Sequence, residues 1–469
     1  METPAWHQHV GGLTILEPGD SPLTFERLVE NVASRIGGAP KFKWKLRQMP
    51  LGLDRPVWVD DPQFDVRRHM KRIAVPAPGG FRETAEVAGM LLGSQLDRNR
   101  PLWEMWFIEG LEGGRVGLLM KYHHCLLDGI AGASLATVMM DLEPNATEPL
   151  VPLPSLEEQS AGPDPDDLHV LGQVVSETLR RPLRLGRYLV GGALKLGAGA
   201  AVLARDAEHR SKVLRAPTTP FNAPIGPRRA LSYASVSIED LKEVKAKHDV
   251  KINDVIMALV AGALREYLIE TDELPEAPLV TAMPVSTRAE GDTTLDNQVS
   301  NTFTSLATDI ADPVERLKAI NVSAQSAKAL QQAMSARQIQ SLGEVASPLI
   351  LSMALRALYE TKIASRTAGT IANTIVSNVP GPPIPLYVCG ARVTGIYPCS
   401  VIMETMGLNV TVLSYMDRVD FGFHVDPDLV PDPWLIAKQI FPALAELKKA
   451  SGLDAPAPVA DAFGHTVDD

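Results

Sequence analysis

The chain has 469 residues, about three times the length of a usual domain, and this length predicts two domains with enough residues to bury a core. A lone small module is excluded. Hydrophobic residues make up 45% of the chain and charged residues 22%, with a mean hydropathy of +0.01, which predicts a soluble folded protein. The net charge of −11 gives nucleic acid no overall attraction, so we expect no nucleic-acid partner, and any anionic partner must meet a local basic patch.

The cysteines and the hydrophobic runs indicate the compartment. Cys125, Cys389 and Cys399 are too few and too scattered for a disulfide framework or a zinc ribbon, which is typical of a reducing compartment. The first residues lack the basic flank and apolar run of a signal peptide. The longest apolar stretch, residues 189–204, is interrupted by Lys195 and by glycines, and it is shorter than the ~20 residues that span a bilayer. We therefore expect a cytoplasmic protein with no metal site.

The first informative elements are a buried strand predicted over residues 115–124 and a helix predicted over residues 127–142. Between them runs the segment His123-His124-Cys125-Leu126-Leu127-Asp128-Gly129. Successive side chains of a strand point to opposite faces, so His123 and His124 cannot both serve one site, which argues against a metal pair. A single histidine facing a cleft can act as a general base, because its unperturbed pKa near ~6.5 lets it take up and return a proton.

Asp128 and Gly129 stand at the predicted start of this helix. Asp128 can cap the helix backbone there or hold an arginine through paired hydrogen bonds, and Gly129 leaves room for a substrate. The alternative interpretation is a buried structural pair of histidines followed by a helix cap. The position at a strand end, with Asp-Gly and a helix directly after it, favours a functional site.

A long segment of biased composition divides the chain. Residues 141–167 contain eight acidic residues, six prolines and no Lys or Arg, which is typical of a linker. Residues 177–215 carry nine Lys or Arg against three acidic residues, with leucines interspersed, so this part is cationic and partly amphipathic. It is either a solvated helix between the domains or an attachment to anionic lipid at a membrane or lipid droplet. We assign residues 1–142 to an N-terminal domain, 143–220 to the linker, 221–453 to a C-terminal domain and 454–469 to a disordered tail.

The C-terminal domain shows helices interleaved with strands. One helix is expected to begin at Ser237, whose hydroxyl can cap it, and a second at Asn253, with an apolar face that runs from Ile256 to Tyr267. Further helices are predicted over residues 312–332, 346–360 and 432–449, and strands over residues 279–283, 370–377, 407–415 and 418–425, the last two joined by a turn at 416–417. The pattern predicts an α/β protein in two units with sheets of mixed direction.

With these segments in place, the chain resembles a known family. His-His-x-x-x-Asp-Gly is the signature of CoA-dependent acyltransferases and condensation domains, and the chain is similar over about residues 5–450 to the bacterial wax ester synthase/diacylglycerol acyltransferases. The further matching segments are Pro101-Leu102-Trp103-Glu104, Asn253-Asp254, Pro284 to Arg288, and Ser377 to Pro382, in the family's order and rough spacing. The resemblance implies a two-domain chloramphenicol-acetyltransferase-like fold, each domain a mixed sheet flanked by helices, with an active-site tunnel at the domain interface.

The resemblance also implies roles for individual residues. His124 would be the general base, His123 would support it, and Asp128, next to Gly129, would orient the structure, for example against Arg288. The implied substrate-binding residues are Asn253, Asp254, Arg288, Asn378, Pro380 and Gly381. Simpler explanations exist for several of them, because Asn is a preferred helix cap and residues 377–382 read as a strand end followed by a turn rich in Pro and Gly.

One departure from the family concerns the first residues. The family usually begins with a short Leu-Ser-x-x-Asp-x-x-Phe-Leu element, and this chain opens after it, at the stretch that matches His9-Val10-Gly11-Gly12. The expectation is either a misassigned start or a shorter N-terminal domain.

The activity implied by the resemblance is direct transfer from acyl-CoA, as cosubstrate, to diacylglycerol or a long-chain alcohol, without a permanently bound cofactor. Two alternatives keep the fold: a condensation-type enzyme that uses a carrier-protein thioester, and a non-catalytic lipid-binding homologue. A serine esterase is disfavoured, because Gly132-Ala133-Ser134-Leu135-Ala136 lacks the second glycine of a nucleophile elbow. Cys125 is disfavoured as a nucleophile because on the strand it shares a face with His123 and not with His124.

Overall fold

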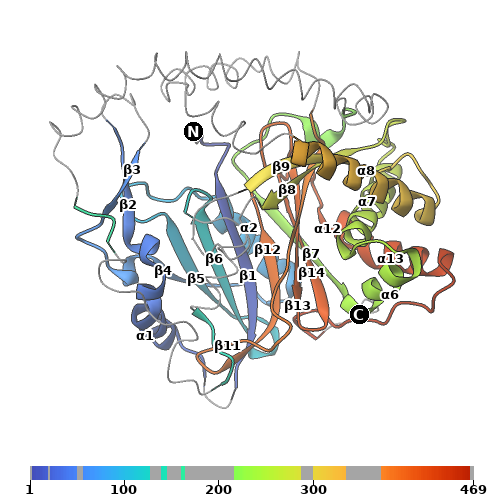
Figure 1. The fold of residues 1–469 in the computed structure, drawn as a ribbon. Coiled ribbons are helices and arrows are strands. Elements are labelled where there is room, and N and C mark those ends of the chain that lie inside the picture. Colours follow the sequence, from blue (N-terminus) through green and yellow to red (C-terminus); the bar gives the residue numbers. More distant parts are fainter. Residues whose placement is uncertain are drawn as a thin grey trace, which may run out of the picture.

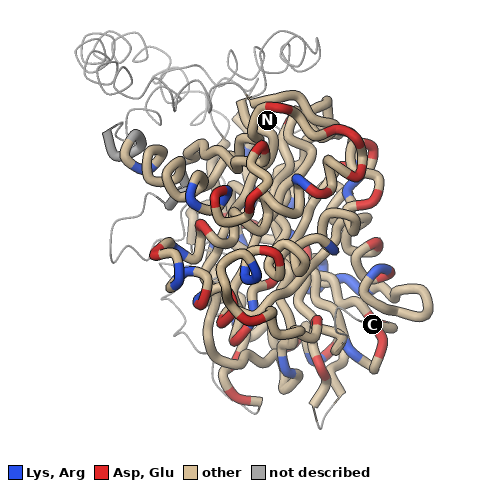
Figure 2. Tube along the Cα trace, turned by 90° about the vertical axis from the view of Figure 1, so that its right-hand side faces the viewer, with Lys and Arg blue, Asp and Glu red and all other residues tan. Residues whose placement is uncertain are grey.

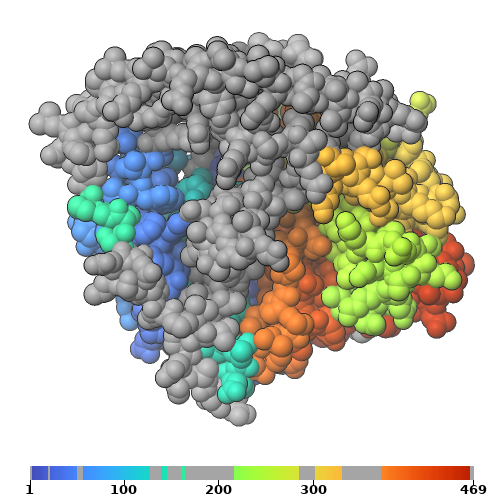
Figure 3. Space-filling model, viewed as in Figure 1, coloured from blue at the N-terminus to red at the C-terminus, as the bar shows by residue number. Residues whose placement is uncertain are grey.

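The computed structural model describes residues 3–19, 22–49, 56–126, 139–144, 160–163, 216–286, 299–333 and 371–464. These residues form two mixed β-sheets that lie side by side, with the N-terminal half in blue and most of the C-terminal half in green to red (Figures 1 and 3). The predicted class, an α/β protein in two units, is confirmed. The helix predicted over 346–360, most of the helix predicted over 127–142 and the basic segment 177–215 lie outside the described residues.

The N-terminal sheet is completed by two strands from the other end of the chain. Its strand order is β11-β12-β1-β6-β5-β4, in which only β4 and β5 pair in parallel. The sequence assigned residues 387–399 to the C-terminal domain, but here β12 pairs with β1 and β11 pairs with β12, because β1 has a free edge once β6 occupies the other. The strands are β1 (His9–Glu17), β4 (Met70–Ala74), β5 (Trp103–Glu109), β6 (Val116–His123), β11 (Tyr387–Val388) and β12 (Ala391–Cys399).

Two helices and a small hairpin accompany this sheet. Helix α1 (Phe25–Arg35) is capped by Thr24 and buries Leu28, Val29 and Val32 against the sheet. Helix α2 (Phe81–Gly93) instead packs on the first strand of the other sheet, where Gly89 lies against the backbone of Arg229. Strands β2 (Trp44–Arg47) and β3 (Val57–Asp60) pair separately. Helix α2 therefore belongs to both halves of the molecule.

The second sheet has the order β7-β14-β13-β10-β8-β9, with β10 parallel to both of its neighbours. Its helices gather on one side (Figure 1), where their apolar faces share a single core with the sheet. The strands are β7 (Ala230–Ser237), β8 (Val280–Ser286), β9 (Val299–Ser305), β10 (Thr374–Val379), β13 (Leu408–Tyr415) and β14 (Arg418–Val425). The helices are α6 (Ile238–His248), α7 (Ile252–Glu270), α8 (Pro313–Ala333), α12 (Trp434–Ala437) and α13 (Ile440–Ala450).

Local sequence patterns predicted most ends of these helices and strands correctly. Ser237 caps α6 through hydrogen bonds from the backbone of Glu239 and Asp240 to its hydroxyl, as predicted. The hairpin of β13 and β14 turns at 416–417, also as predicted. The predicted cap at Asn253 is wrong: α7 begins two residues earlier, with Lys251 at the cap, and Asp254 accepts a hydrogen bond from the backbone N–H of Lys251. An acidic residue at the third helical position accepts from the backbone N–H of the cap residue, which is one of the two bonds of a capping box.

The two sheets meet where β12 crosses β14. A side chain at Gly422 would overlap the backbone oxygen of Pro398, so only glycine permits this approach. Next to it, the buried carboxylate of Asp420 accepts a hydrogen bond from the backbone N–H of Ile396. Strand β12 thus belongs by pairing to one sheet and by packing to the other.

The C-terminal segment differs from the expected disordered tail. Residues 454–464 lie along the molecule, and Ala462 and Phe463 are buried in a cluster that draws on both halves. The backbone N–H of Ala462 donates to the hydroxyl of Tyr397, and Arg418 donates to the carbonyl of Ala460. The composition of this segment, rich in Ala, Pro and Asp, predicted disorder. Instead, Ala462 and Phe463 near its end pack into the cluster that joins the two halves.

Charge and hydropathy of the described surface agree with the composition. Lys and Arg segments alternate with Asp and Glu segments on the side seen in Figure 2, without a large field of one sign among the described residues. Among the helices described, none has the length and apolar character needed to cross a membrane.

Candidate active site

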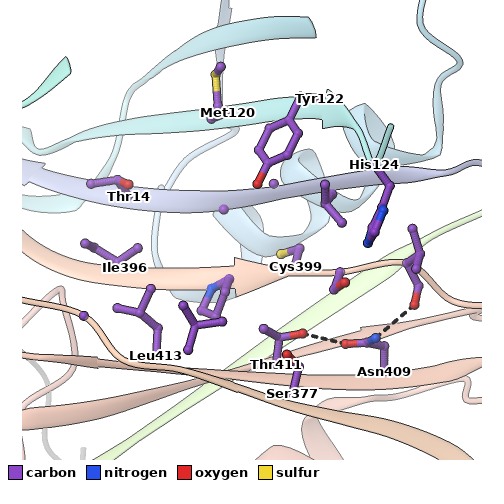
Figure 4. Close-up of a pocket in the computed structure, with 18 of the residues that line it drawn as sticks. Thr14, Met120, Tyr122, His124, Ser377, Ile396, Cys399, Asn409, Thr411 and Leu413 are labelled. Carbon is purple, nitrogen blue, oxygen red and sulfur yellow. Dashed lines mark hydrogen bonds between the residues drawn. The ribbon is translucent and has the colours of Figure 1, made fainter. Parts of the chain in front are cut away.

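A cavity of about 980 Å³ lies between the two sheets, and residues from strands of both sheets line it, most of them at alternate positions. Because side chains of a strand alternate between faces, one set of residues from each strand points inward. The walls are mainly apolar, with a few polar groups among them (Figure 4). The alternate inward residues are Val10, Gly12 and Thr14 on β1, Leu118, Met120 and Tyr122 on β6, Ile396 and Pro398 on β12, Asn409, Thr411 and Leu413 on β13, Ile375, Ser377 and Val379 on β10, Ala282 and Pro284 on β8, and Asn301 and Phe303 on β9.

His124 enters this cavity directly after β6 ends. Strands β1 and β6 pair as far as His9 and His123, and the next backbone N–H, that of His124, donates to the carbonyl of Gln8 at 2.7 Å. The side chain of His124 is half-buried and lines the cavity (Figure 4). His123 lies on the opposite face, buried, and its Nδ1 accepts the backbone N–H of Cys125 at 3.0 Å. The alternation predicted from the sequence thus holds, and only one of the two histidines faces the cavity.

Buried polar groups hold the back of β6 against α2. Lys121 is fully buried, and its ammonium group donates to the carbonyls of Leu91 and Ser94 and contacts the carboxylate of Glu104 at 2.9 Å. Burial opposes ionisation of Glu104, but the ammonium groups of Lys121 and Lys71 hold its pKa below the ordinary value. These contacts fix the strand two residues before the motif and so fix where His124 projects.

The wall opposite His124 carries a polar pair that the sequence analysis missed. Asn409 is fully buried on β13, its Nδ2 donates to the carbonyl of Val401 at 2.9 Å, and its Oδ1 accepts the hydroxyl of Thr411 at 2.7 Å. The side-chain amide is therefore held in one orientation, facing the cavity below His124 (Figure 4). Polar residues at alternate positions of an otherwise apolar strand were the available signal, because each one must find a partner when buried.

Two neighbouring titratable groups stay neutral around pH 7. Burial raises the pKa of the Cys399 thiol, which lines the cavity, to about 12. Burial, with help from Arg229 and His7, lowers the pKa of His424 to about 3, and its Nδ1 lies 2.5 Å from the carbonyl of Ser400. His424 pairs with Asn409 across the sheet, so it supports that strand as a neutral hydrogen-bonding group.

Of the other predicted site residues that the structure describes, only some line the cavity. Pro380 and Gly381 line the cavity, but Asn378 is exposed, and its neighbours Ser377 and Val379 face inward in its place. Asn253 and Asp254 lie outside the cavity wall on α7, where the Asn253 amide contacts the sulfur of Met283 and Asp254 caps the helix. Asp128, Gly129 and Arg288 lie outside the described residues. Within the described part of the chain, no group of three or more His, Cys, Asp or Glu residues could hold a metal ion.

Two sheets that share a cavity, with one histidine of a His-His motif projecting into it from a strand end, define the fold of the CoA-dependent acyltransferases. Solved condensation domains show the same fold: the first condensation domain of the calcium-dependent antibiotic synthetase aligns with a TM-score of 0.56 at 14% identity, over 99% of this chain and 94% of that chain. The wax ester synthase/diacylglycerol acyltransferase of Marinobacter aquaeolei VT8 aligns with a TM-score of 0.69 at 28% identity, over 97% of each chain.

Sequence comparison identifies the family. The profile of the wax ester synthase/diacylglycerol acyltransferase catalytic domain matches residues 1–256, and that of the WS/DGAT C-terminal domain matches residues 295–448. A Mycobacterium tuberculosis H37Rv protein named as a diacylglycerol O-acyltransferase is 36% identical over 96% of this chain and 88% of its own length. A second one from that strain, tgs1, is 34% identical over 93% of this chain and 90% of its own length. The chain belongs to the wax ester synthase/diacylglycerol acyltransferase family and is an acyltransferase.

Proposed function

We propose that this protein esterifies the hydroxyl group of a lipid alcohol, diacylglycerol or a long-chain alcohol, with the acyl group of acyl-CoA, and that His124 is the general base. The observation that carries the proposal is one imidazole in a large apolar cavity between the two sheets. Apolar walls suit two hydrocarbon substrates, and a few polar groups suffice to orient their reacting ends. The names of the relatives support both acceptor classes.

The reaction needs only proton transfer and stabilisation of one negative charge. Neutral His124 takes the proton of the acceptor hydroxyl as its oxygen attacks the thioester carbonyl of acyl-CoA. The tetrahedral intermediate then expels the CoA thiolate, which is a good leaving group with a pKa near ~8.5 and receives the proton from the imidazolium. The products are the ester and free CoA thiol. Neither a covalent acyl-enzyme nor a serine nucleophile takes part.

Asn409 is the donor that we propose for the oxyanion of this intermediate. One hydrogen of its Nδ2 is used by Val401, and Thr411 fixes the amide through its oxygen, so the second Nδ2 hydrogen is the one that we propose for the oxyanion. A preorganised amide donor of this kind typically lowers the barrier by ~3 kcal/mol. Asn378, which the family resemblance implied as a substrate-binding residue, is exposed on the other face of β10, so the proposal gives the donor role to Asn409.

The other expected residues take secondary roles in the proposal. His123 supports the strand end through its contact with the Cys125 backbone. Asp128, next to Gly129, is assigned the orienting role against Arg288 that the family resemblance implies. Pro380 and Gly381 shape the wall beside β10. Asn253 and Asp254 are assigned a structural role at the start of α7.

The decisive experiment compares purified His124→Ala with wild type, following free CoA thiol and ester formed from palmitoyl-CoA and each acceptor. We expect loss of at least ~100-fold in turnover at an unchanged melting temperature, since general-base catalysis contributes about 100- to 10,000-fold. Cys125→Ser is the matched control: the thiol is exposed and next in sequence, and its removal should leave the rate unchanged. Wild-type turnover in His124→Ala with a normal melting temperature contradicts the assignment.

The same assay separates the alternatives. A lipid-binding homologue would release no thiol from acyl-CoA with any acceptor. A condensation-type enzyme would be inactive with acyl-CoA but would form ester from an acyl carrier-protein thioester. Ester and thiol in equal amounts from acyl-CoA and a lipid alcohol support the proposed function.

Contact with a lipid surface is part of the proposal. Leu142, Ile371 and Ile384 line the cavity and are also exposed, so apolar side chains stand at its rim. The basic segment 177–215 would add attraction to anionic lipid of up to ~1 kcal/mol for each basic residue near the surface. Liposome co-sedimentation at low and high salt, for the full chain and for a 177–215 deletion, tests this; equal pelleting of both proteins rejects the role of the segment.

A further inference from the structure

The wall that β1 contributes to the cavity lacks a side chain at one position. Val10, Gly12 and Thr14 face inward on this strand, and Gly12 contributes no side chain. A Cβ built at Gly12 would have only backbone atoms of β12 within 4 Å, Tyr397 O at 3.5 Å and Pro398 Cα at 3.8 Å, which are ordinary contacts. Atoms beyond the Cβ would therefore project into open cavity. By contrast, a Cβ at Gly11 would lie 2.0 Å from the carbonyl oxygen of Met120, so Gly11 is needed for strand packing.

The strand register places Gly12 part of the way along the cavity. It pairs with Met120, four residues before His124, which corresponds to about 13 Å along the strand at ~3.3 Å per residue. The cavity continues beyond this level, past Leu118, to Leu28 and Val32 of α1 and to Leu386 and Val388. All of these are apolar. Thr14 and Asn31 also line this far compartment, but most of its wall is apolar and suits a hydrocarbon chain.

We infer that the hydrocarbon chain of a lipid substrate passes over the backbone of Gly12 on its way from His124 into this far compartment, and that this position, the aperture, sets the chain length accepted because no side chain fills it. The inference rests on the proposed function, which places the reacting carbonyl and hydroxyl at His124. A membrane-lipid chain spans about 15 Å, half of the ~30 Å hydrocarbon core of a bilayer, so its end passes Gly12. A short chain ends before that level.

The test is a graded series, Gly12→Ala, Gly12→Val and Gly12→Leu, assayed with butyryl-, octanoyl- and palmitoyl-CoA and one acceptor, and separately with short and long alcohols and one acyl-CoA. Gly12→Ala is the matched control, because it makes the same change of backbone freedom with the smallest side chain. Each methylene kept out of the cavity lowers kcat/KM about fourfold, so Val and Leu should cost the longest chains on the order of 100-fold and leave the shortest within about twofold.

The two substrate series identify which chain passes Gly12. A length-dependent loss in the acyl-CoA series assigns the far compartment to the acyl chain, and one in the alcohol series assigns it to the acceptor; either result supports the aperture. An equal loss at every length in both series, or no loss with Gly12→Leu, overturns it. Gly11→Ala provides the contrast, with an expected fall in melting temperature and an equal loss at all lengths.

Binding gives a readout that does not depend on turnover. Displacement of a fluorescent fatty acid by unlabelled fatty acids of increasing length should show weaker binding of long chains to Gly12→Leu, with unchanged binding of short ones. If the wild-type protein formed no ester, the proposed function would fail, while this series would still decide on the aperture: length-independent displacement in Gly12→Leu refutes it.

Discussion

Replacing Phe463 by alanine tests whether the end of the chain joins the two halves of the molecule. The Phe463 ring is 3% exposed and lies 5.2 Å, centroid to centroid, from the ring of Phe81 at the start of α2. Its cluster also contains Tyr233 and Tyr397 from the C-terminal half of the chain. A disordered tail would make none of these contacts, so the variant distinguishes the observed packing from the composition-based expectation.

The expected destabilisation follows from burial. Truncating a buried phenylalanine costs about 3–5 kcal/mol, and a site close to a chain end relaxes more readily than the centre of a core, so we expect about 3 kcal/mol. The hydrogen bonds of Ala462 with Tyr397 and Thr394 remain, which limits the loss. For a chain of 469 residues that unfolds as one unit, 3 kcal/mol lowers the melting temperature by about 3 °C.

Urea unfolding followed by tryptophan fluorescence, together with thermal unfolding, measures this effect. Asp454→Ala is the control, since Asp454 is exposed in the same segment and surface changes usually stay within about 0.5 kcal/mol. Trp434 and Tyr233 share the cluster with Phe81, so fluorescence reports on the region directly. A loss below about 1 kcal/mol in Phe463→Ala, or an equal loss in the control, refutes the reasoning.

Three further predictions concern the site and its supports. Asn409→Ala should lower kcat by about 100-fold with little change in KM, because the donor acts on charge that develops in the transition state; steady-state kinetics on protein with a wild-type circular dichroism spectrum check it. Burial lowers the pKa of His424 to about 3 in the folded protein, whereas its pKa in the unfolded chain is near ~6.5. Because the unfolded chain takes up the proton at a higher pH, the free energy of unfolding falls as the pH drops below ~6.5, by up to about 1.4 kcal/mol per pH unit. His424→Gln, which keeps a donor for Ser400, should flatten the urea-midpoint curve between pH 6.5 and 5; parallel curves contradict this. Lys121→Met should cost about 3–5 kcal/mol by leaving Glu104 in a buried site with one cation fewer, and adding Glu104→Gln should recover part of the loss in the same unfolding assay.

Local sequence patterns were enough to predict the part of the site on β6. An apolar run that ends at a His-His pair predicts a buried strand, and the alternation of strand faces predicts that only one of the two histidines faces a cavity. In the structure, His124 lines the cavity at the end of β6. The hairpin of β13 and β14 and the cap at Ser237 were predictable for the same reason, because a few adjacent residues determine each of them.

The opposite wall could not be predicted from local patterns. Whether Ser377 or Asn378 faces the cavity depends on where β10 begins and with which partner it aligns, and a shift of one residue exchanges the faces. Asn409 shows its role only when β13 is placed against His124, which lies 285 residues earlier in the chain. The packing of Phe463 is equally non-local, since its partners come from α2, β7 and β12.

Strand β12 explains why the two walls keep a fixed distance. On one side, β12 pairs with β1, and β1 pairs with β6, which carries His124 at its end. On the other side, β12 packs against β14, and β14 pairs with β13, which carries Asn409. The contact of Gly422 with the backbone of Pro398 fixes this crossing. A larger residue at 422 would push β12 away from β14 and separate the proposed base, His124, from the proposed oxyanion donor, Asn409, without touching either. Gly422→Ala should therefore reduce turnover with all substrates alike, in contrast to the length-dependent loss expected at Gly12, and kcat measured on folded variants of both positions distinguishes the two.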